Sequence, residues 1–294
     1  MKVSTTLIVL AWVIVLLAAL AAGVGVFWND AGKPFAFTTI HGETVQLAGR
    51  GLYRYDSTLI AEGFRDQDIY ILAVGIPLLI LSAVLYRRGS LRGGLLLTGS
   101  LLYFFYNYFS MTFGAAYNNL LLVYIVLMAA SLFGLIYALT LFDARAFPKH
   151  FSERLPRRAI AIFLIFIGVA FLIIWGGLDL IPTTLAGKLP ATLGHYTTVI
   201  TFGIDLGILA PAMLISGILL LRRESVGYLF ATVLLIFTLV LNLQLALMGV
   251  MQYLAGLMSI GQFIGMSVSF DLIALIALGF TIALFRNFSE TVIA

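Results

Sequence analysis

Residues 69–86 read IYILAVGIPLLILSAVLY, an apolar run without a charged side chain. The chain then passes through Arg87-Arg88-Gly89-Ser90 and enters a second apolar segment at residues 94–113. A helix needs about 20 mostly apolar residues to cross the roughly 30 Å hydrocarbon core of a bilayer. Two apolar runs joined by a short basic turn therefore predict two antiparallel membrane-spanning helices.

The same pattern extends over the whole chain of 294 residues. The predicted spans are approximately 5–27, 69–86, 94–113, 119–142, 159–178, 197–221, 227–251 and 257–285. Apolar residues make up 62% of the chain and charged residues 10%, and the mean hydropathy is +1.10. Soluble domains contain roughly 45–50% apolar and about 25% charged residues. The sequence therefore predicts an all-α polytopic membrane protein with about eight transmembrane helices. Its composition excludes the soluble, disordered and nucleic-acid-binding classes.

The distribution of basic residues predicts the orientation, because cytoplasmic loops are enriched in Lys and Arg. With a cytoplasmic N-terminus, 12 of the 17 basic residues lie on the cytoplasmic side. These are Lys2, Arg87, Arg88, Arg92, Arg145, Lys149, Arg154, Arg157, Arg158, Arg222, Arg223 and Arg286. Both termini are then cytoplasmic. The small residues of Leu20-Ala21-Ala22-Gly23 leave an alternative open, in which the first segment is a cleaved signal peptide and seven spans remain.

The long outer loop, residues 28–68, carries the pattern of a β-hairpin. Phe35–Ile40 and Glu43–Leu47, rich in aromatic and β-branched residues, read as two strands around the turn His41-Gly42, and Leu52–Tyr55 is a possible third strand. A segment of about 40 residues is too short to fold alone without staples. We therefore expect a small outer β-hairpin that rests on the helices.

An internal repeat is indicated by the recurrence of Arg87-Arg88-Gly89-Ser90-Leu91 as Arg222-Arg223-Glu224-Ser225-Val226. In each case an asparagine follows the second arginine by nineteen residues, Asn107 in one copy and Asn242 in the other. We infer a 4+4 parallel repeat: a first four-helix half (1–142, with loop 28–68), a cytoplasmic linker (143–158) and a second four-helix half (159–294). The alternative is that the arginine pairs only anchor helix ends at the membrane surface.

Three stretches carry a resemblance to known sequences. They are Arg87–Arg92, Phe113–Asn118 and Asp205-Leu206-Gly207. These resemble stretches of multi-pass bacterial membrane proteins without an assigned function. The resemblance implies a bacterial inner membrane and supplies no activity, ligand or site.

Two ionisable residues lie inside predicted spans, Asp205 and Asp271. A charged side chain at that depth costs about 2.5–3.5 kcal/mol and usually faces the bundle interior or a water-filled cavity. Helical spacing places Thr201 on the face of Asp205 and Ser267 on the face of Asp271. We expect the two aspartates to line one outward-open cavity as a proton or cation site. The alternative is a carboxyl group that only bonds a neighbouring helix.

Further polar residues lie in the outer half of the predicted membrane region. Tyr106 and Asn107 share a stripe of the third span, Asn242 lies in the seventh, and Gln244 is predicted to point elsewhere. Together with Asn118 and Asn119, they predict a polar pocket that opens outward. The alternative is that these residues join helices through hydrogen bonds of about 0.6 kcal/mol each.

Several chemistries find no support in the sequence. The chain has no cysteine, its three histidines fall in predicted loops, and no predicted span contains a lysine. No cofactor or metal site is predicted, no catalytic residue is assigned, and nucleic acid is not an expected partner.

Three functions remain open. The first is binding or transport of a small solute or lipid through the outer pocket, with the hairpin as a lid. The second is a sensor or assembly subunit whose hairpin contacts a partner. The third is a membrane-embedded enzyme acting on a lipid-linked substrate, with Asp205 and Asp271 as acid and base.

Overall fold

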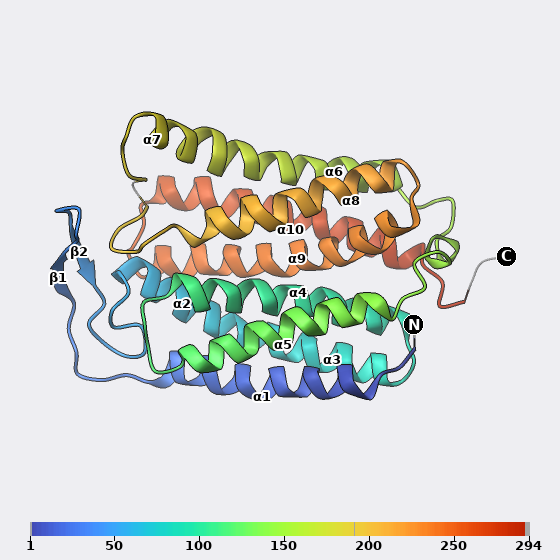
Figure 1. Cartoon of the computed structure of the whole chain (residues 1–294), viewed down its shortest axis with the longest axis horizontal. Coiled ribbons are helices and arrows are strands. Elements are labelled where there is room, and N and C mark those ends of the chain that lie inside the picture. The colour runs from blue at the N-terminus through green and yellow to red at the C-terminus, as the bar shows by residue number, and fades with distance from the viewer. Residues whose placement is uncertain (1, 191, 292–294) are drawn as a thin grey trace.

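The structure is a computed structural model that describes residues 2–190 and 192–291. Within these residues, eight helical rods lie side by side along the long axis, with a small β-hairpin at one end (Figure 1). The rods are α1 (Thr5–Phe27), α2–η1–α3 (Thr58–Tyr70, Ile71–Gly75, Ile76–Arg87), α4 (Leu91–Gly114), α5 (Leu121–Thr140), α6–η3–α7 (Arg157–Phe171, Leu172–Leu180, Ile181–Leu185), η4–α8 (Phe202–Leu209, Ala210–Leu221), α9 (Ser225–Leu254) and α10 (Ile260–Arg286).

Seven of the rods in the described part of the chain are long and apolar enough to cross a membrane. The eighth, α4, is as long as its neighbours but more polar, and it packs against α3, α5 and α9 in the middle of the bundle. Its polar side chains Thr98, Ser100 and Asn107 are fully buried against the neighbouring rods. The predicted all-α multi-pass membrane architecture is confirmed.

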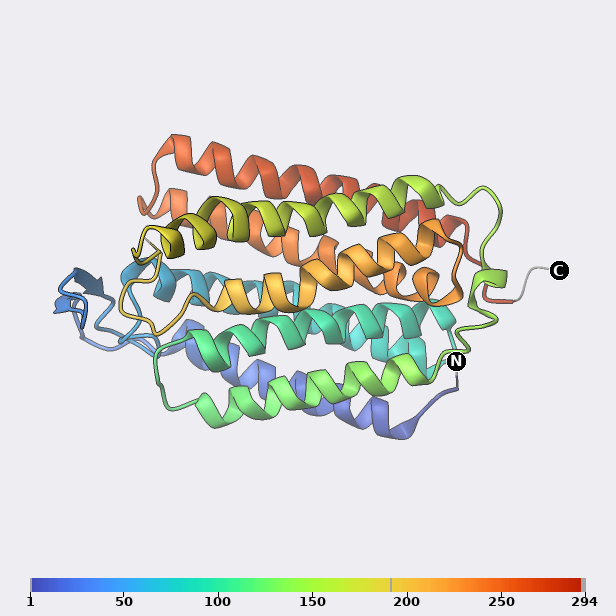
Figure 2. The ribbon, with the colours of Figure 1, turned by 45° about the horizontal axis from the view of Figure 1, so that its top comes forward.

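The two ends of the bundle differ in construction (Figures 1 and 2). The N- and C-terminal regions and the turns at Arg87-Arg88 and Arg222-Arg223 lie at one end, which we call the arginine-turn end. The opposite end, called here the hairpin end, carries the hairpin and the loops 115–120, 186–201 and 255–259. Alternate rods run in opposite directions between them, as the sequence predicts.

The predicted hairpin is present as β1 (Phe35–Thr38) and β2 (Thr44–Leu47). They pair antiparallel, with Phe35 opposite Leu47 and Thr38 opposite Thr44. Two details of the prediction are wrong. Leu52–Tyr55 forms a turn and not a third strand, and α2 begins at Thr58, so the last eleven residues of the predicted loop 28–68 are helical.

Three rods contain a stretch of π-helix, which the sequence analysis did not predict. The stretches η1, η3 and η4 each end two residues before a proline, namely Pro77, Pro182 and Pro211. Proline lacks an N–H group and its ring crowds the preceding helical turn. A wider turn relieves that crowding, and π-helical turns of this kind occur frequently at functional sites.

The two arginine turns have the same local geometry. Gly89 and Arg223 both adopt a positive φ, of 84° and 62°. The next residue bonds back in each turn, Ser90 N to Leu85 O at 3.1 Å and Glu224 N to Leu219 O at 2.9 Å. Matching positions of the two turns are therefore 134 residues apart, and the same spacing separates Pro77 from Pro211.

This spacing differs by one residue from that of Asn107 and Asn242, which are 135 residues apart. In the register of the turns, Asn107 corresponds to Leu241 and Asn242 to Tyr108. One residue along a helix is a rotation of about 100°. The two asparagines therefore lie on different faces of their helices.

Candidate functional site

The loop Gly51–Ser57 covers the hairpin end of the bundle between β2 and α2. Gly51 has φ = 65°, and a Cβ atom there would lie 2.7 Å from the carbonyl oxygen of Trp28. Only glycine fits both the conformation and the approach. This close contact brings the loop down onto the end of α1 and places the side chains of Tyr53, Arg54, Tyr55 and Asp56 over the helices.

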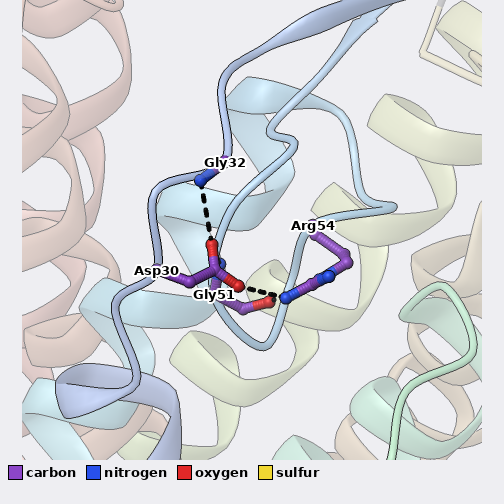
Figure 3. Close-up of polar contacts among 4 residues, drawn as sticks. All are labelled: Asp30, Gly32, Gly51 and Arg54. Carbon is purple, nitrogen blue, oxygen red and sulfur yellow. Dashed lines mark hydrogen bonds and ion pairs between the residues drawn. The ribbon is translucent and has the colours of Figure 1, made fainter.

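Arg54 and Asp30 form one wall of this region (Figure 3). The guanidinium group pairs with the Asp30 carboxylate, and its Nε donates to Gly51 O at 3.2 Å. Asp30 also accepts from the N–H groups of Gly51 at 3.1 Å and Gly32 at 3.3 Å. The bonds from Gly51 and Gly32 and the charge of Arg54 together lower the pKa of Asp30. Asp30 is therefore ionised at neutral pH, and the charges of the pair cancel.

A pocket of about 440 Å³ opens beside this wall. Its lining combines three aromatic side chains, two amides and the Arg54 wall, and consists of Trp28, Gly51, Leu52, Arg54, Tyr55, Tyr117, Asn118 and Asn119. The volume falls within the range of roughly 300–1,000 Å³ typical of small-ligand sites. The predicted outer polar residues Asn118 and Asn119 therefore border a pocket formed by the Gly51–Ser57 loop and the α4–α5 loop.

A buried carboxyl group lies beneath the loop. Asp68 of α2 is fully buried, and its Oδ2 accepts a hydrogen bond of 2.6 Å from the Tyr53 hydroxyl. A Cβ atom on Gly25 of α1 would lie 1.8 Å from the same oxygen, so the carboxyl rests directly on the α1 backbone. Burial raises the pKa of Tyr53 well above its usual value, which keeps this hydroxyl protonated as the donor.

Asp56 joins three loops of the hairpin end. Its Oδ1 accepts from Ala116 N at 2.8 Å and from the Tyr196 hydroxyl at 2.9 Å. The side chain is 1% exposed, and burial raises the pKa of Asp56 to about 6. His195 Nε2 lies 2.8 Å from Tyr55 O, and burial lowers the pKa of this imidazole. The Gly51–Ser57 loop is thus bonded to the α4–α5 loop through Asp56 and to the 192–199 loop through Asp56 and Tyr55.

Asp205, the first predicted site residue, is buried in η4. The Trp175 indole donates to its Oδ2 at 3.0 Å, and the Tyr106 side chain of α4 lies beside the same carboxyl. Thr201 is half-buried and directly precedes η4. Asp205 and Tyr106, both among the predicted pocket residues, therefore lie next to each other between η4 and α4.

Asp271 has a different environment from the predicted one. It lies on the exposed face of α10, whereas Ser267 on the preceding turn is 1% exposed and packs against Gly249 of α9. The expectation that Asp205 and Asp271 share a cavity is wrong, because α10 buries one narrow stripe against α9 and Asp271 lies outside it. The enzyme hypothesis, which requires Asp205 and Asp271 as a neighbouring acid and base, therefore has no such pair.

Asn107 belongs to a closed hydrogen-bond ring between α4 and α9. Gln244 Nε2 donates to Asn107 Oδ1 at 3.0 Å, and the Tyr103 hydroxyl donates to Gln244 Oε1 at 2.5 Å. Asn107 Nδ2 donates back to Tyr103 O at 2.9 Å. Gln244, and not Asn242, is therefore the residue of α9 that bonds to Asn107. Asn242 bonds to Thr238 O of its own helix at 2.8 Å.

Sequence reasoning missed Tyr53, Asp56 and Asp68 as site residues. All three fall within the predicted loop 28–68, where polar residues are expected to be solvated and do not indicate a site. The overlooked signal is Ser57 followed by an apolar stretch, the pattern of a helix N-cap. It would have extended the second span to Thr58 and placed Asp68 inside the bundle.

Among residues 2–190 and 192–291, no group of three His, Cys, Asp or Glu side chains is arranged to hold a metal ion. Comparison of the chain with protein-family models, with curated proteins and with solved structures finds no similar protein. Its function is therefore inferred from the geometry of the hairpin end.

Proposed function

We propose that this multi-pass membrane protein binds a small solute or lipid headgroup in the pocket between the Gly51–Ser57 loop and the α4–α5 loop. The pocket of about 440 Å³ carries the proposal, because three aromatic side chains and two amides line a cavity large enough for a ligand. The loop is the lid of this pocket, and Asp56 is its attachment to the rest of the hairpin end.

The proposed orientation puts the hairpin end outside a bacterial inner membrane and both termini in the cytoplasm. The asymmetry of basic residues supports it. Reporter fusions after Gly89 and Glu224 should give a cytoplasmic signal, and a fusion in the hairpin an external one. A periplasmic signal at either arginine turn would contradict this orientation.

The proposed duplication relates residues 1–142 to residues 159–294 by an axis along the membrane normal, as in parallel-repeat transporters. The shared geometry of the two arginine turns and the prolines 134 residues apart support it. Movement of one half against the other at the α4–α9 contact would then carry a bound ligand across the membrane. Asp205, beside Trp175 and Tyr106, is the proposed intramembrane proton or cation site.

The test is to extract the full chain with native lipids and identify co-purifying small molecules by native mass spectrometry. Tyr117 is 76% exposed and lines the pocket. Tyr117→Ala should lower ligand occupancy, whereas Tyr253→Ala, an exposed tyrosine of α9 outside the pocket lining, should leave it unchanged. Equal occupancy in both variants would contradict the proposal.

A role as a sensor or assembly subunit is the second candidate, favoured by the exposed hairpin. All four residues of β1 are exposed, and Ile40 in the adjoining turn is 94% exposed. Replacing residues 35–47 with a glycine-rich linker distinguishes the two functions. Ligand occupancy that survives together with loss of a co-purifying protein would favour the second.

A further inference from the structure

The polar groups of the pocket lining that have no partner within the described part of the protein indicate which chemical class of ligand the pocket can bind. A charged ligand that enters a pocket loses hydration, and an unpaired charge of opposite sign must compensate that loss. Arg54 is the charged side chain of the lining, and its guanidinium group is engaged by the Asp30 carboxylate and by Gly51 O. Asp30 is engaged in turn by two backbone N–H groups. Figure 3 shows this closed arrangement.

Of the next charged groups along the same edge, Arg50 and Glu62 pair with each other, with their nearest atoms 3.4 Å apart, and Arg65 donates to Val26 O at 3.2 Å. A phosphate or carboxylate ligand would therefore have to displace an existing partner of an arginine. An amine would have to displace Arg54 from Asp30. Neither class of ion finds an unpaired counter-charge in the lining.

The groups that remain available are neutral. Asn119 is exposed, and no hydrogen bond within the described residues engages its amide. Asn118 is used by its own loop, since its Oδ1 accepts from Leu120 N at 3.0 Å. The hydroxyls of Tyr55 and Tyr117 belong to side chains that are 54% and 76% exposed, so they can act as donors or acceptors.

The aromatic faces add a second requirement. Trp28 is 40% exposed and follows the end of α1, and Tyr117 is 76% exposed and lies in the loop after α4. The electron-rich face of an aromatic ring attracts weakly polarised C–H groups. A ligand with hydroxyl groups at its rim and a C–H face matches the amide, the phenols and the rings together.

We infer that the pocket takes the uncharged, hydroxyl-rich ring of a sugar, either a free saccharide or the glycosyl headgroup of a lipid. This inference rests on the proposed binding function and names its ligand class. The neutral amide of Asn119 bonds the hydroxyls, and the rings of Trp28 and Tyr117 contact the C–H face. The Arg54–Asp30 pair forms one wall, and its two charges neutralise each other and not a charge on the ligand.

The experiment uses the full chain in phosphatidylcholine nanodiscs with three probes: maltose, monoglucosyl diacylglycerol and phosphatidylglycerol. Maltose binding is measured by calorimetry, and lipid retention by native mass spectrometry. Binding of maltose or of the glucosyl lipid, weakened about tenfold in Tyr117→Ala and in Asn119→Ala and unchanged in Tyr253→Ala, is the expected result. Maltose binding identifies a free sugar as the source, and glucosyl-lipid binding alone identifies a headgroup.

The contrary results separate the two proposals. Preferential retention of phosphatidylglycerol that Tyr117→Ala abolishes would overturn the sugar assignment and leave the pocket as a ligand site. Failure of every pocket variant to differ from Tyr253→Ala, with any probe, would overturn both. Each variant is compared only after size-exclusion chromatography has established a folded, monodisperse protein.

Discussion

Residues 1–142 and residues 159–294 each bury aspartate side chains in a rod that runs from the hairpin end to an arginine turn: Asp66 and Asp68 in α2, and Asp205 in η4. Asp68 lies in α2 ahead of η1 and Pro77, and Asp205 lies in η4 ahead of Pro211. Each carboxyl accepts a hydrogen bond from an aromatic side chain, Tyr53 for Asp68 and Trp175 for Asp205. The two carboxyls are therefore held by similar donors at different positions, because Asp68 lies nine residues before Pro77 and Asp205 six residues before Pro211.

The two regions differ in the element that supplies the hydrogen-bond donor to the buried aspartate. In the first half the donor to the aspartate comes from the Gly51–Ser57 loop, which also forms the pocket. In the second half the donor comes from η3, a membrane rod without a buried residue in its π-helical stretch. A buried aspartate thus lies under the pocket-forming loop in residues 1–142 and between two rods in residues 159–294. The specialised part of the protein is the loop, and the helices position it.

The largest expected effect is at the contact between α1 and Asp68. Gly25→Ala would put a methyl group 1.8 Å from the Asp68 carboxyl, closer than atoms can approach, so α1 and α2 must separate. Overpacking of this kind costs about 1–3 kcal/mol. We expect a loss near about 3 kcal/mol, measured as a lowered midpoint of thermal unfolding in detergent.

Gly23→Ala is the matched control, because no atom lies within 4 Å of a Cβ atom added at this position. It should leave the unfolding midpoint unchanged or raise it slightly, since alanine favours helix over glycine by about 1 kcal/mol. Equal destabilisation by the two substitutions would mean that Asp68 does not rest on α1.

Asp56 gives the next largest effect. Asp56→Ala removes the acceptor of Ala116 N and the Tyr196 hydroxyl, and leaving buried donors unpaired costs about 1–3 kcal/mol each. We expect a loss of about 2 kcal/mol in the free energy of unfolding at pH 7. Asp56→Asn keeps one acceptor oxygen and should lose much less.

The two Asp56 variants also separate charge from hydrogen bonding. Burial raises the pKa of Asp56 to about 6, above the value near 3.9 of an unfolded chain. The folded state then binds the proton more tightly, so this group stabilises the fold below about pH 4 and loses that contribution as the pH rises through about 6. The difference in unfolding midpoint between wild type and Asp56→Asn should therefore favour wild type at pH 4 more than at pH 7.5. A difference independent of pH would show that Asp56 does not titrate in this range.

In the second half a smaller effect is expected. Asp205→Ala leaves the Trp175 indole N–H without its acceptor, which costs about 1–2 kcal/mol. Asp271→Ala removes an exposed side chain and should change the unfolding midpoint little. Thermal unfolding of both variants in the same detergent checks the contrast. A larger loss for Asp271→Ala would indicate that a further protein surface covers this face of α10.

Composition and periodicity predict the rods well, because a membrane span is a local property of about 20 residues. The number of rods, their alternating direction and the β-hairpin are confirmed on this basis. The start of α2 is missed because Glu62, Arg65, Asp66 and Asp68 lower the hydropathy of a segment that is helical all the same. Tertiary packing against α1 and α9 compensates for that polarity.

The candidate site is harder to predict because it depends on long-range contacts. Asp56 meets Tyr196 across 140 residues, and Gln244 meets Asn107 across 137. Helical spacing compares residues on one helix and contains no information about which face meets which neighbour. The same reasoning explains the failure for Asp271, whose spacing to Ser267 is correct but whose side chain falls outside the buried stripe of α10.

The smallest effect tests the equivalence of the two arginine turns. Arg223 adopts φ = 62° where the first turn has Gly89 at φ = 84°. A left-handed conformation costs a non-glycine residue roughly 1–2 kcal/mol, part of which glycine loses again through its greater freedom in the unfolded chain. Arg223→Gly should therefore raise the free energy of unfolding by about 0.5 kcal/mol, and Gly89→Ala should lower it by about 1 kcal/mol.

Arg222→Gly is the control for Arg223→Gly, because it removes the same charge from the adjacent position. Arg222 has φ = −74°, a conformation that arginine adopts without strain, so glycine there should destabilise the protein by about 1 kcal/mol. Opposite signs for the two neighbouring substitutions would establish that the second turn is built on the backbone geometry of the first. If both substitutions changed the free energy of unfolding in the same direction, the similarity of the turns would reflect only a preference for arginine at helix ends. The proposed duplication would then lose its strongest local support.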